Sequence, residues 1–169
     1  MTDWPVWALV VLGYVVLQRL AELVYAQANT RRLLAEGGQE YGRSHYPLFI
    51  LLHGGWLIAI ALTARPPAAP DTVLLVIFIS SQIFRFWTLA SIGRWWTTRI
   101  ISSPDFPRVR KGPYRFIAHP NYAVVAVEIA FLPLLLGTPL VALIFSLANA
   151  MLLAFRIRME AGVLVHRKS

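Results

Sequence analysis

The chain has 169 residues, of which 57% are hydrophobic and 14% are charged, and it contains no cysteine. Soluble domains carry about a quarter charged residues, so this composition excludes an ordinary water-soluble domain and favours one membrane domain. The absence of cysteine excludes disulfides, thiol nucleophiles and zinc–thiolate sites, and we expect no metal. The formal net charge is +8, and the basic residues fall in short loops between apolar runs, so we expect anionic lipid headgroups as partners and no nucleic acid.

Three apolar runs occupy the first half of the chain, at 4–26, 45–64 and 71–93. Each reaches the length of roughly 20 residues with which a helix spans a bilayer. The proline-rich segment 65–70 separates the second run from the third, since proline cannot continue a helix. Asp71 is a good N-cap for the third helix. The sequence therefore predicts three spanning helices before the long polar loop.

Polar side chains interrupt these runs. Arg19 and Glu22 lie one helical turn apart, and two interpretations stay open for them: an ion pair near the membrane edge, or the lining of an internal polar cavity. Gln82 and Arg85 share a face of the third helix that should point inward or reach the interface. We interpret His53, a lone histidine in the second helix, as a packing or hydrogen-bonding residue rather than a ligand.

The second half begins with the polar stretch 94–118, in which prolines exclude one continuous helix and aromatic residues argue against disorder. A fourth apolar helix follows at about 121–136, with Pro120 suited to its first turn and His119 near its cap. After a Gly-Thr-Pro turn, a fifth helix runs over about 140–155 and continues into a basic, amphipathic end.

These elements predict an all-α fold, a polytopic membrane bundle of about five transmembrane helices in one domain, 1–169. Residues 1–93 hold the three N-terminal spans, and residues 94–169 hold the polar loop, the last two spans and the C-terminal helix end. Lysine and arginine cluster in 27–44, in 94–118 and in the C-terminal tail. The positive-inside rule therefore places the N-terminus outside and the C-terminus in the cytoplasm.

Two polar regions fall on the cytoplasmic side, the stretch 111–122 and one face of the last helix, where Asn149, Arg156 and Glu160 follow at helical spacing. The helix start at His119 offers backbone N–H groups to an anion. Arg156 could hold a carboxylate, and Glu160 could accept from an ammonium or a ribose diol. Nearby aromatic rings could stack on a base or lie against a cation. These groups match the parts of S-adenosylmethionine, and they would also suit a nucleotide or a lipid headgroup. No Gly-x-Gly-x-x-Gly follows a strand, so a soluble Rossmann-type methyltransferase is not indicated.

The order of motifs in the second half resembles that of the isoprenylcysteine carboxyl methyltransferase family. The motifs are Gly112-Pro-Tyr-Arg-Phe-Ile-Ala-His-Pro-Asn-Tyr122, then Glu128, then Arg156-Ile-x-x-Glu160, and the similarity covers about residues 90–165. The resemblance implies an integral-membrane methyltransferase that uses S-adenosylmethionine. Its cofactor pocket is formed by the C-terminal half and opens to the cytosol, and its lipid-like acceptor enters from the bilayer. The chain has Ala118 where the family usually has arginine, and Ala161 where it usually has a second acid.

A second likeness concerns the acceptor. The run Trp95-Trp96-Thr97-Thr98-Arg99, together with Gly112-Pro113, resembles bacterial members of this superfamily that methylate a hydroxyl of alkylpyrone or phenolic lipids. The resemblance therefore implies a lipid-like acceptor such as a prenylcysteine or an alkylpyrone or phenolic lipid. The methylated oxygen belongs to a carboxylate or to a hydroxyl.

Two sets of site residues follow from the resemblance. At the cofactor, whose product is S-adenosylhomocysteine, we expect Gly112, Pro113, Tyr114, His119, Pro120, Tyr122, Asn149, Arg156 and Glu160. At the acceptor we expect Arg85, Trp95, Trp96 and Arg99.

Methyl transfer from a sulfonium is an in-line displacement, so positioning should supply most of the rate. We predict Arg156 and Glu128 as catalytic residues. A carboxylate acceptor needs a cation, and Arg156 or Arg85 could serve. A phenol-like acceptor would benefit from a base, and Glu128 or His119 could serve. An alternative stays open for Glu128, namely an ion pair with Arg85 or Arg19 inside the bundle.

Two other functions stay open. The charged residues within the spans could form the polar path of a transporter, or the basic loops could belong to a lipid-binding scaffold subunit without catalysis. Polar residues gather on one side of the membrane, which disfavours the transporter. The pair Gly54-Gly55 could mark a close helix contact within one chain or between two chains, so a homo-oligomer is a further open alternative.

Overall fold

The computed structural model describes residues 4–107 and 109–165, so Arg108 and the last four residues of the basic tail lie outside the described residues. Five long α-helices run through the described part of the chain: α1 (Val6–Ala35), α2 (Tyr46–Thr63), α3 (Thr72–Ile92), α4 (Pro120–Leu135) and α5 (Pro139–Val165). The all-α prediction is confirmed, and α1 continues beyond its apolar run to Ala35.

Four of the described helices are long and apolar enough to cross a membrane, namely α1, α2, α3 and α5. The remaining helix, α4, has 16 residues, fewer than the roughly 20 that span a bilayer. The sequence limits α4 at both ends: Pro120 stands in its first turn, and Gly137 has a left-handed φ of +75° just beyond Leu136. The chain is an integral membrane protein with four full-length candidate spans and a shorter fifth helix.

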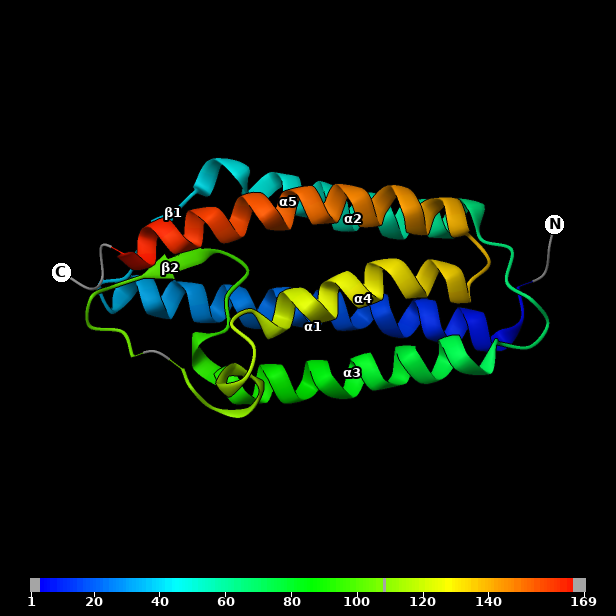
Figure 1. Ribbon diagram of the computed structural model, residues 1–169, viewed down its shortest axis with the longest axis horizontal. Helices are drawn as coiled ribbons and strands as arrows, with labels where there is room; N and C mark the ends of the chain where they lie inside the picture. The colour runs from blue at the N-terminus through cyan, green and yellow to red at the C-terminus, as the bar shows by residue number, and fades with distance from the viewer. Residues whose placement is uncertain (1–3, 108, 166–169) are drawn as a thin grey trace.

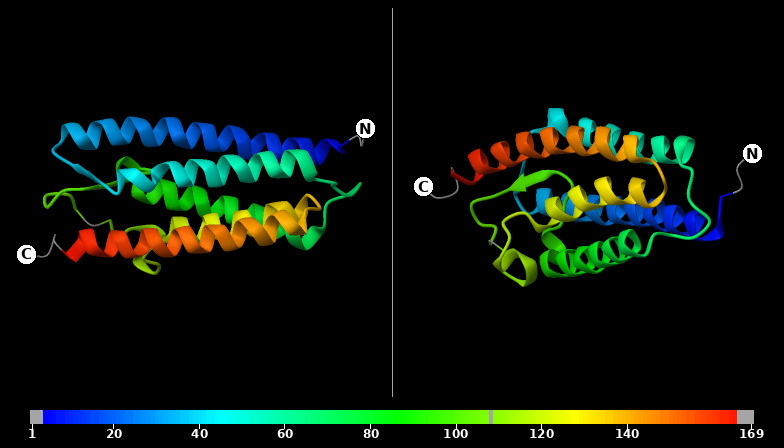
Figure 2. Two further views of the ribbon diagram at one scale, coloured as in Figure 1. Left: turned by 90° about the horizontal axis from the view of Figure 1, so that it is seen from above. Right: turned by 45° about the vertical axis from the view of Figure 1, so that its right-hand side comes forward.

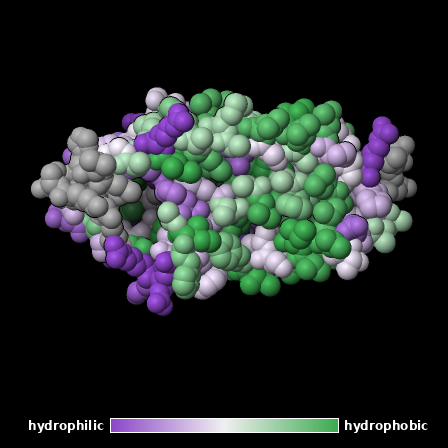
Figure 3. All heavy atoms as spheres, viewed as in Figure 1, coloured by the Kyte–Doolittle hydropathy of each residue, from purple (hydrophilic) through white to green (hydrophobic). Residues whose placement is uncertain are grey.

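Successive helices alternate in direction, so the start of α1 and the end of α5 lie at opposite ends of the bundle (Figure 1). At the end where α5 finishes lie the segments 36–45, 93–107 and 109–119 (Figure 2). We call this the loop-rich end. Figure 3 shows hydrophobic residues over the middle of the bundle and hydrophilic residues toward its two ends. This distribution suits a helical bundle that crosses a membrane.

A small sheet, which the sequence did not predict, joins two segments of the loop-rich end. Strand β1 (Gln39–Tyr41) pairs antiparallel with β2 (Ile100–Ser102), with Gln39 opposite Ser102. The guanidinium of Arg99 lies 3.0 Å from both carboxylate oxygens of Glu40 beside this pair. Three 3₁₀-helices complete the end: η1 (Arg43–His45), η2 (Gly93–Trp95) and η3 (Gly112–Arg115). The long polar loop is therefore folded against the segment that follows α1.

The apolar core lies among the helices. Trp56 and Ile60 of α2 and Leu132 of α4 are completely buried, and they pack in one cluster with side chains of α1, α3 and α5. Asp71 caps α3 as predicted, because its Oδ1 accepts a hydrogen bond of 2.9 Å from the N–H of Leu74. The core therefore holds the helices together and leaves the loop-rich end to form a site.

The turn between α4 and α5 generates the first prediction. Gly137 has φ +75°, and a Cβ there would lie 2.4 Å from the carbonyl oxygen of Arg65. We expect Gly137→Ala to destabilise the protein by at least about 1–2 kcal/mol, the cost of a left-handed backbone at a non-glycine residue. Thermal unfolding in detergent measures this loss. Gly13→Ala in α1 is the matched control, because a Cβ there meets nothing within 4 Å. Equal midpoints for the two variants would contradict the prediction.

Candidate functional site

A cavity of about 520 Å³ opens at the loop-rich end and extends into the bundle. Its walls come from α1, α2, the end of α3, the loop 95–102, the segment 114–122 and α5. The volume lies in the range of about 300–1,000 Å³ that is usual for small-molecule sites. The cavity therefore brings the two polar regions of the second half to one place.

Four side chains form a hydrogen-bonded group at the outer part of the cavity. The hydroxyl of Tyr122 donates to Glu160, and Arg156 Nε donates to Tyr122 Oη at 2.8 Å and to Glu160 Oε1 at 3.1 Å. His119 Nδ1 lies 3.4 Å from Glu160 Oε2, and the His119 ring stacks on Tyr122 with 5.0 Å between centroids. We call these four residues the outer cluster. Glu160 is thus its central acceptor.

The outer cluster is held from several elements. Arg156 and Glu160 are four residues apart on α5, so both point to one side, as predicted. Arg156 Nη1 also donates to the carbonyl oxygen of Thr98 at 2.9 Å, and its guanidinium lies 4.9 Å from the ring centroid of Phe49 on α2. Arg156 therefore joins α5 to the polar loop and to α2.

The first turn of α4 offers fewer free backbone N–H groups to an anion than we predicted from the sequence. Pro120 has no N–H, and the N–H groups of Tyr122 and Ala123 both donate to the carbonyl oxygen of His119, at 3.1 and 3.3 Å. Two side-chain atoms nearby lack a hydrogen-bond partner. Trp96 Nε1 and Asn121 Oδ1 are buried without a partner among the described residues, and both side chains line the cavity. Such orphaned polar groups favour a polar ligand, because leaving them unpaired is unfavourable.

Aromatic side chains form another wall. Trp95, Trp96 and Tyr114 line the cavity, and Trp95 packs on Phe106 with 5.1 Å between ring centroids. Burial raises the pKa of Tyr114 above its ordinary value, and the carboxylate of Glu160 acts in the same direction. Tyr114 is therefore a neutral hydrogen-bonding group at physiological pH. Planar and neutral groups of this kind suit a flat base or a cation.

The predicted site residues separate into two groups. The following line the cavity: Arg85, Trp95, Trp96, Arg99, Tyr114, His119, Pro120, Tyr122, Arg156 and Glu160. Gly112, Pro113, Asn149 and Glu128 do not line it. Gly112 has φ +53° and faces Ser91, while Pro113 and Asn149 are buried. These three residues are therefore not at the cavity surface.

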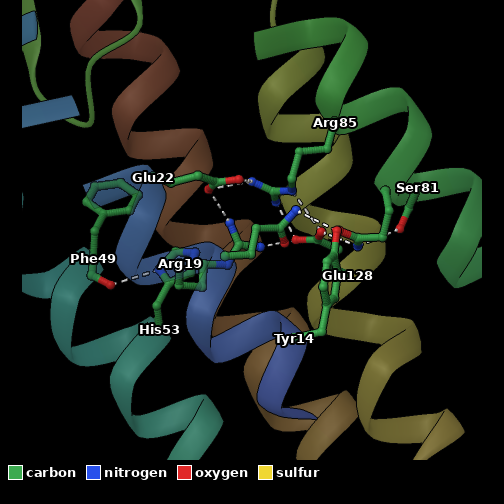
Figure 4. A network of polar contacts seen from close by, with 10 residues as sticks. Tyr14, Arg19, Glu22, Phe49, His53, Ser81, Arg85 and Glu128 are labelled. Carbon is green, nitrogen blue, oxygen red and sulfur yellow. Dashed lines mark hydrogen bonds and ion pairs between the residues drawn. The ribbon is translucent and has the colours of Figure 1, made fainter. Parts of the chain in front are cut away.

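Glu128 belongs to a separate buried network deeper in the bundle (Figure 4). Its Oε1 accepts from Gln82 Nε2 at 2.6 Å and from Arg85 Nε at 2.8 Å, and its Oε2 contacts both Arg85 and Arg19. Glu22 accepts from Arg85 and from Arg19, both at 2.9 Å. We call these five residues the inner network. The pairing of Glu128 with Arg85 and Arg19, one of the two alternatives from the sequence, is confirmed.

The inner network balances its charges. It contains two arginines and two glutamates, so its formal charge is zero. A buried charge without a partner is strongly unfavourable, and mutual pairing with further hydrogen bonds offsets that penalty. Arg19 and Glu22 pair with each other within the bundle and also line the cavity, which agrees with the second interpretation and with the pairing, but not the edge position, of the first.

Sequence reasoning missed one face of α2. Tyr46, Phe49 and His53 all line the cavity, and the Tyr46 hydroxyl lies 3.1 Å from the hydroxyl of Thr98. The spacing of these three residues at i, i+3 and i+7 puts them on one helical face. That pattern of aromatic and polar side chains in an apolar helix was the available signal.

Comparisons with known proteins agree with the position of the motifs in the second half of the chain. The family model described as the isoprenylcysteine carboxyl methyltransferase (ICMT) family matches residues 73–166. The chain is 37% identical to "Uncharacterized protein YpbQ" of Bacillus subtilis, over 91% of this chain and 93% of that protein. It is 23% identical to an "Uncharacterized protein" of Haemophilus influenzae, over 88% of this chain and 89% of that one. No solved structure matches the chain.

The inner network generates the second prediction. Glu128→Gln leaves two buried guanidinium groups facing one carboxylate, so we expect a loss of about 3–5 kcal/mol in stability, measured by thermal unfolding in detergent. The double variant Glu128→Gln with Arg19→Gln removes one charge of each sign and should recover part of the loss. Glu36→Gln is the control, because Glu36 pairs with Arg94 in a half-exposed contact whose typical worth is about 0–1 kcal/mol. Wild-type stability in Glu128→Gln would contradict the prediction.

Proposed function

Because the chain belongs to the isoprenylcysteine carboxyl methyltransferase family, a family of membrane methyltransferases, we propose that it transfers a methyl group from S-adenosylmethionine to an oxygen of a lipid-like acceptor. One observation supports this most directly. The His-Pro-x-Tyr element at the start of α4 and the Arg-Ile-x-x-Glu element of α5 meet through Tyr122, Arg156 and Glu160 at one cavity.

The residues of the outer part of the cavity fit the cofactor. Glu160 would accept from its ammonium or ribose hydroxyls, and Arg156 would hold its carboxylate. Trp96 and Tyr114 offer flat surfaces, and the unpaired Trp96 Nε1 and Asn121 Oδ1 offer a donor and an acceptor. When bound, S-adenosylmethionine supplies a methyl group on a cationic sulfur.

The chain's own residues would contribute position and water exclusion. The guanidinium of Arg156 is buried and fixed by the carbonyl of Thr98, so it presents a cation in a defined place. With the cofactor carboxylate held there, the reacting carbon would keep a fixed position in line with an acceptor oxygen, which is the main requirement of a displacement. Tyr114 stays neutral and adds no competing negative charge.

Orientation and partners complete the proposal. The loop-rich end carries the basic segments, so the positive-inside rule would place it in the cytoplasm and the start of α1 outside. Its lysine and arginine side chains would lie near anionic lipid headgroups. A lipid-like acceptor would then reach the cavity from the bilayer, while the cofactor would reach it from the cytoplasm.

Binding of S-adenosylhomocysteine tests the proposal. We expect the ligand to raise the unfolding temperature of the wild-type protein, since a ligand that binds only the folded state stabilises it. Glu160→Gln removes a charged acceptor that contributes about 1.5–3 kcal/mol, so the affinity should fall roughly 10- to 100-fold. Calorimetric titration measures the two dissociation constants.

Glu36→Gln, at the same end of the bundle, is the control and should keep the wild-type affinity. An unshifted wild-type unfolding temperature at millimolar ligand would count against the methyltransferase proposal itself. Unchanged affinity in Glu160→Gln would remove Glu160 from the cofactor site alone.

A further inference from the structure

The cavity continues inward beyond the outer cluster along α2. The guanidinium of Arg156 lies over the ring of Phe49, and the carbonyl oxygen of Phe49 is 2.8 Å from Nδ1 of His53. His53 lines the cavity one helical turn deeper than Phe49. Arg19 and Glu22 line the same inner part, and Figure 4 shows His53 close to the inner network. The inner part of the cavity is therefore polar as well.

The hydrogen bond of His53 decides which ring nitrogen carries its proton. A backbone carbonyl can only accept, so Nδ1 must donate to Phe49. In the neutral ring the lone pair is then on Nε2. No group within residues 4–107 and 109–165 hydrogen-bonds to Nε2, and the His53 side chain lines the cavity. His53 thus offers a proton acceptor at the cavity.

The carboxylates at the cavity are already committed. Glu22 accepts from Arg19 and Arg85, both at 2.9 Å. Glu160 accepts from Arg156 and from the hydroxyl of Tyr122. The lone pairs of both carboxylates are thus already used in hydrogen bonds within the protein. Among the described residues of the inner cavity, His53 is therefore the base best placed for a reacting group.

We propose that His53 Nε2 takes the proton of a weakly acidic acceptor hydroxyl during methyl transfer, an inference that rests on the proposed function. The oxygen–hydrogen bond breaks as the oxygen–carbon bond forms and the carbon–sulfur bond breaks. The proton moves to Nε2, which becomes an imidazolium, and the sulfonium becomes a neutral thioether. One positive charge is present before and after the step. General-base catalysis of this kind contributes about 10²- to 10⁴-fold to a rate.

The donor and acceptor pattern favours a hydroxyl over a carboxylate. A carboxylate has no proton to give, and its oxygens would face the lone pair of Nε2. A hydroxyl can donate to Nε2 while its oxygen accepts from a cation, and Arg19 lines the same cavity as His53. An oxyanion that develops there would be stabilised by this guanidinium.

Apolar residues that line the inner part of the cavity indicate that the acceptor has an apolar tail. Leu20 of α1 and Ile50 of α2 line the cavity and are 55% and 53% exposed. Gly54 lies beside them without a side chain. We therefore place the entrance for the acceptor between α1 and α2, where the surroundings would be lipid. An amphiphile with its hydroxyl at His53 would leave its tail in this opening.

The test compares two acceptors that differ in ionisation. Para-decylphenol is neutral at pH 7, since a phenol has a pKa of about 10, whereas its ring-fluorinated analogue, para-decyl-tetrafluorophenol, is already ionised. His53→Asn keeps an amide donor for the Phe49 carbonyl and removes the base. We expect His53→Asn to lower single-turnover transfer to para-decylphenol by about 100-fold or more. Transfer to the ionised analogue should change only a few-fold.

A second measurement needs no turnover. In protein loaded with S-adenosylhomocysteine, bound para-decylphenol should show the red-shifted ultraviolet absorption of a phenol that shares its proton, and His53→Asn should abolish that shift. Leu51→Ala is the control, because Leu51 is 69% exposed on the outer face of the same helix. It should behave as the wild type in both measurements.

The outcomes separate the two proposals. A wild-type protein that does not bind S-adenosylhomocysteine overturns the proposed function and this inference with it. If the wild-type protein binds S-adenosylhomocysteine and methylates para-decylbenzoate but neither phenol, only the proposed role of His53 is overturned. Equal losses on both phenols in His53→Asn also overturn that role, since a structural defect would act on both. His53→Gln serves as a second variant if His53→Asn fails to bind S-adenosylhomocysteine.

Discussion

The pairing of four buried charges, Arg19, Glu22, Arg85 and Glu128, is the constraint on which the arrangement of the bundle depends. A single such charge would be strongly unfavourable among apolar helices, and the four together carry no net charge. They come from α1, α3 and α4, so their pairing fixes these three helices against one another (Figure 4). Because α4 is short, fixing it at Glu128 also fixes its first turn, from which Tyr122 reaches α5.

A second set of contacts holds the other two helices. Arg156 on α5 reaches Tyr122 of α4, the carbonyl of Thr98 in the polar loop and the ring of Phe49 on α2. The cavity lies between this set and the inner network, so it has one polar group near the loops and another within the bundle. Two polar groups joined by apolar walls are what a site needs if it is to hold a polar cofactor and the head of an amphiphile at the same time.

Sequence could predict what depends on local spacing. The cap at Asp71, the helix start at Pro120 and the shared face of Arg156 and Glu160 follow from positions a few residues apart, and all three are present. It could not predict what depends on segments far apart in the chain. Strands β1 and β2 have three residues each, too few to show a period, and their pairing joins positions about sixty residues apart. The expectation of free N–H groups at the start of α4 was wrong in part, because the carbonyl of His119 takes two of them.

The contrast between Glu128 and His53 shows why residue type alone does not assign a role. A glutamate within a span looks like a base, yet two guanidinium groups and the amide of Gln82 occupy its oxygens. A lone histidine in a span looks like a packing residue, and its Nδ1 does bond the backbone of its own helix. That same bond leaves the opposite nitrogen of the ring as an acceptor at the cavity. The capacity to take a proton therefore depends on which lone pairs already accept hydrogen bonds within the fold. The oxygens of Glu128 already accept such bonds, whereas Nε2 of His53 does not.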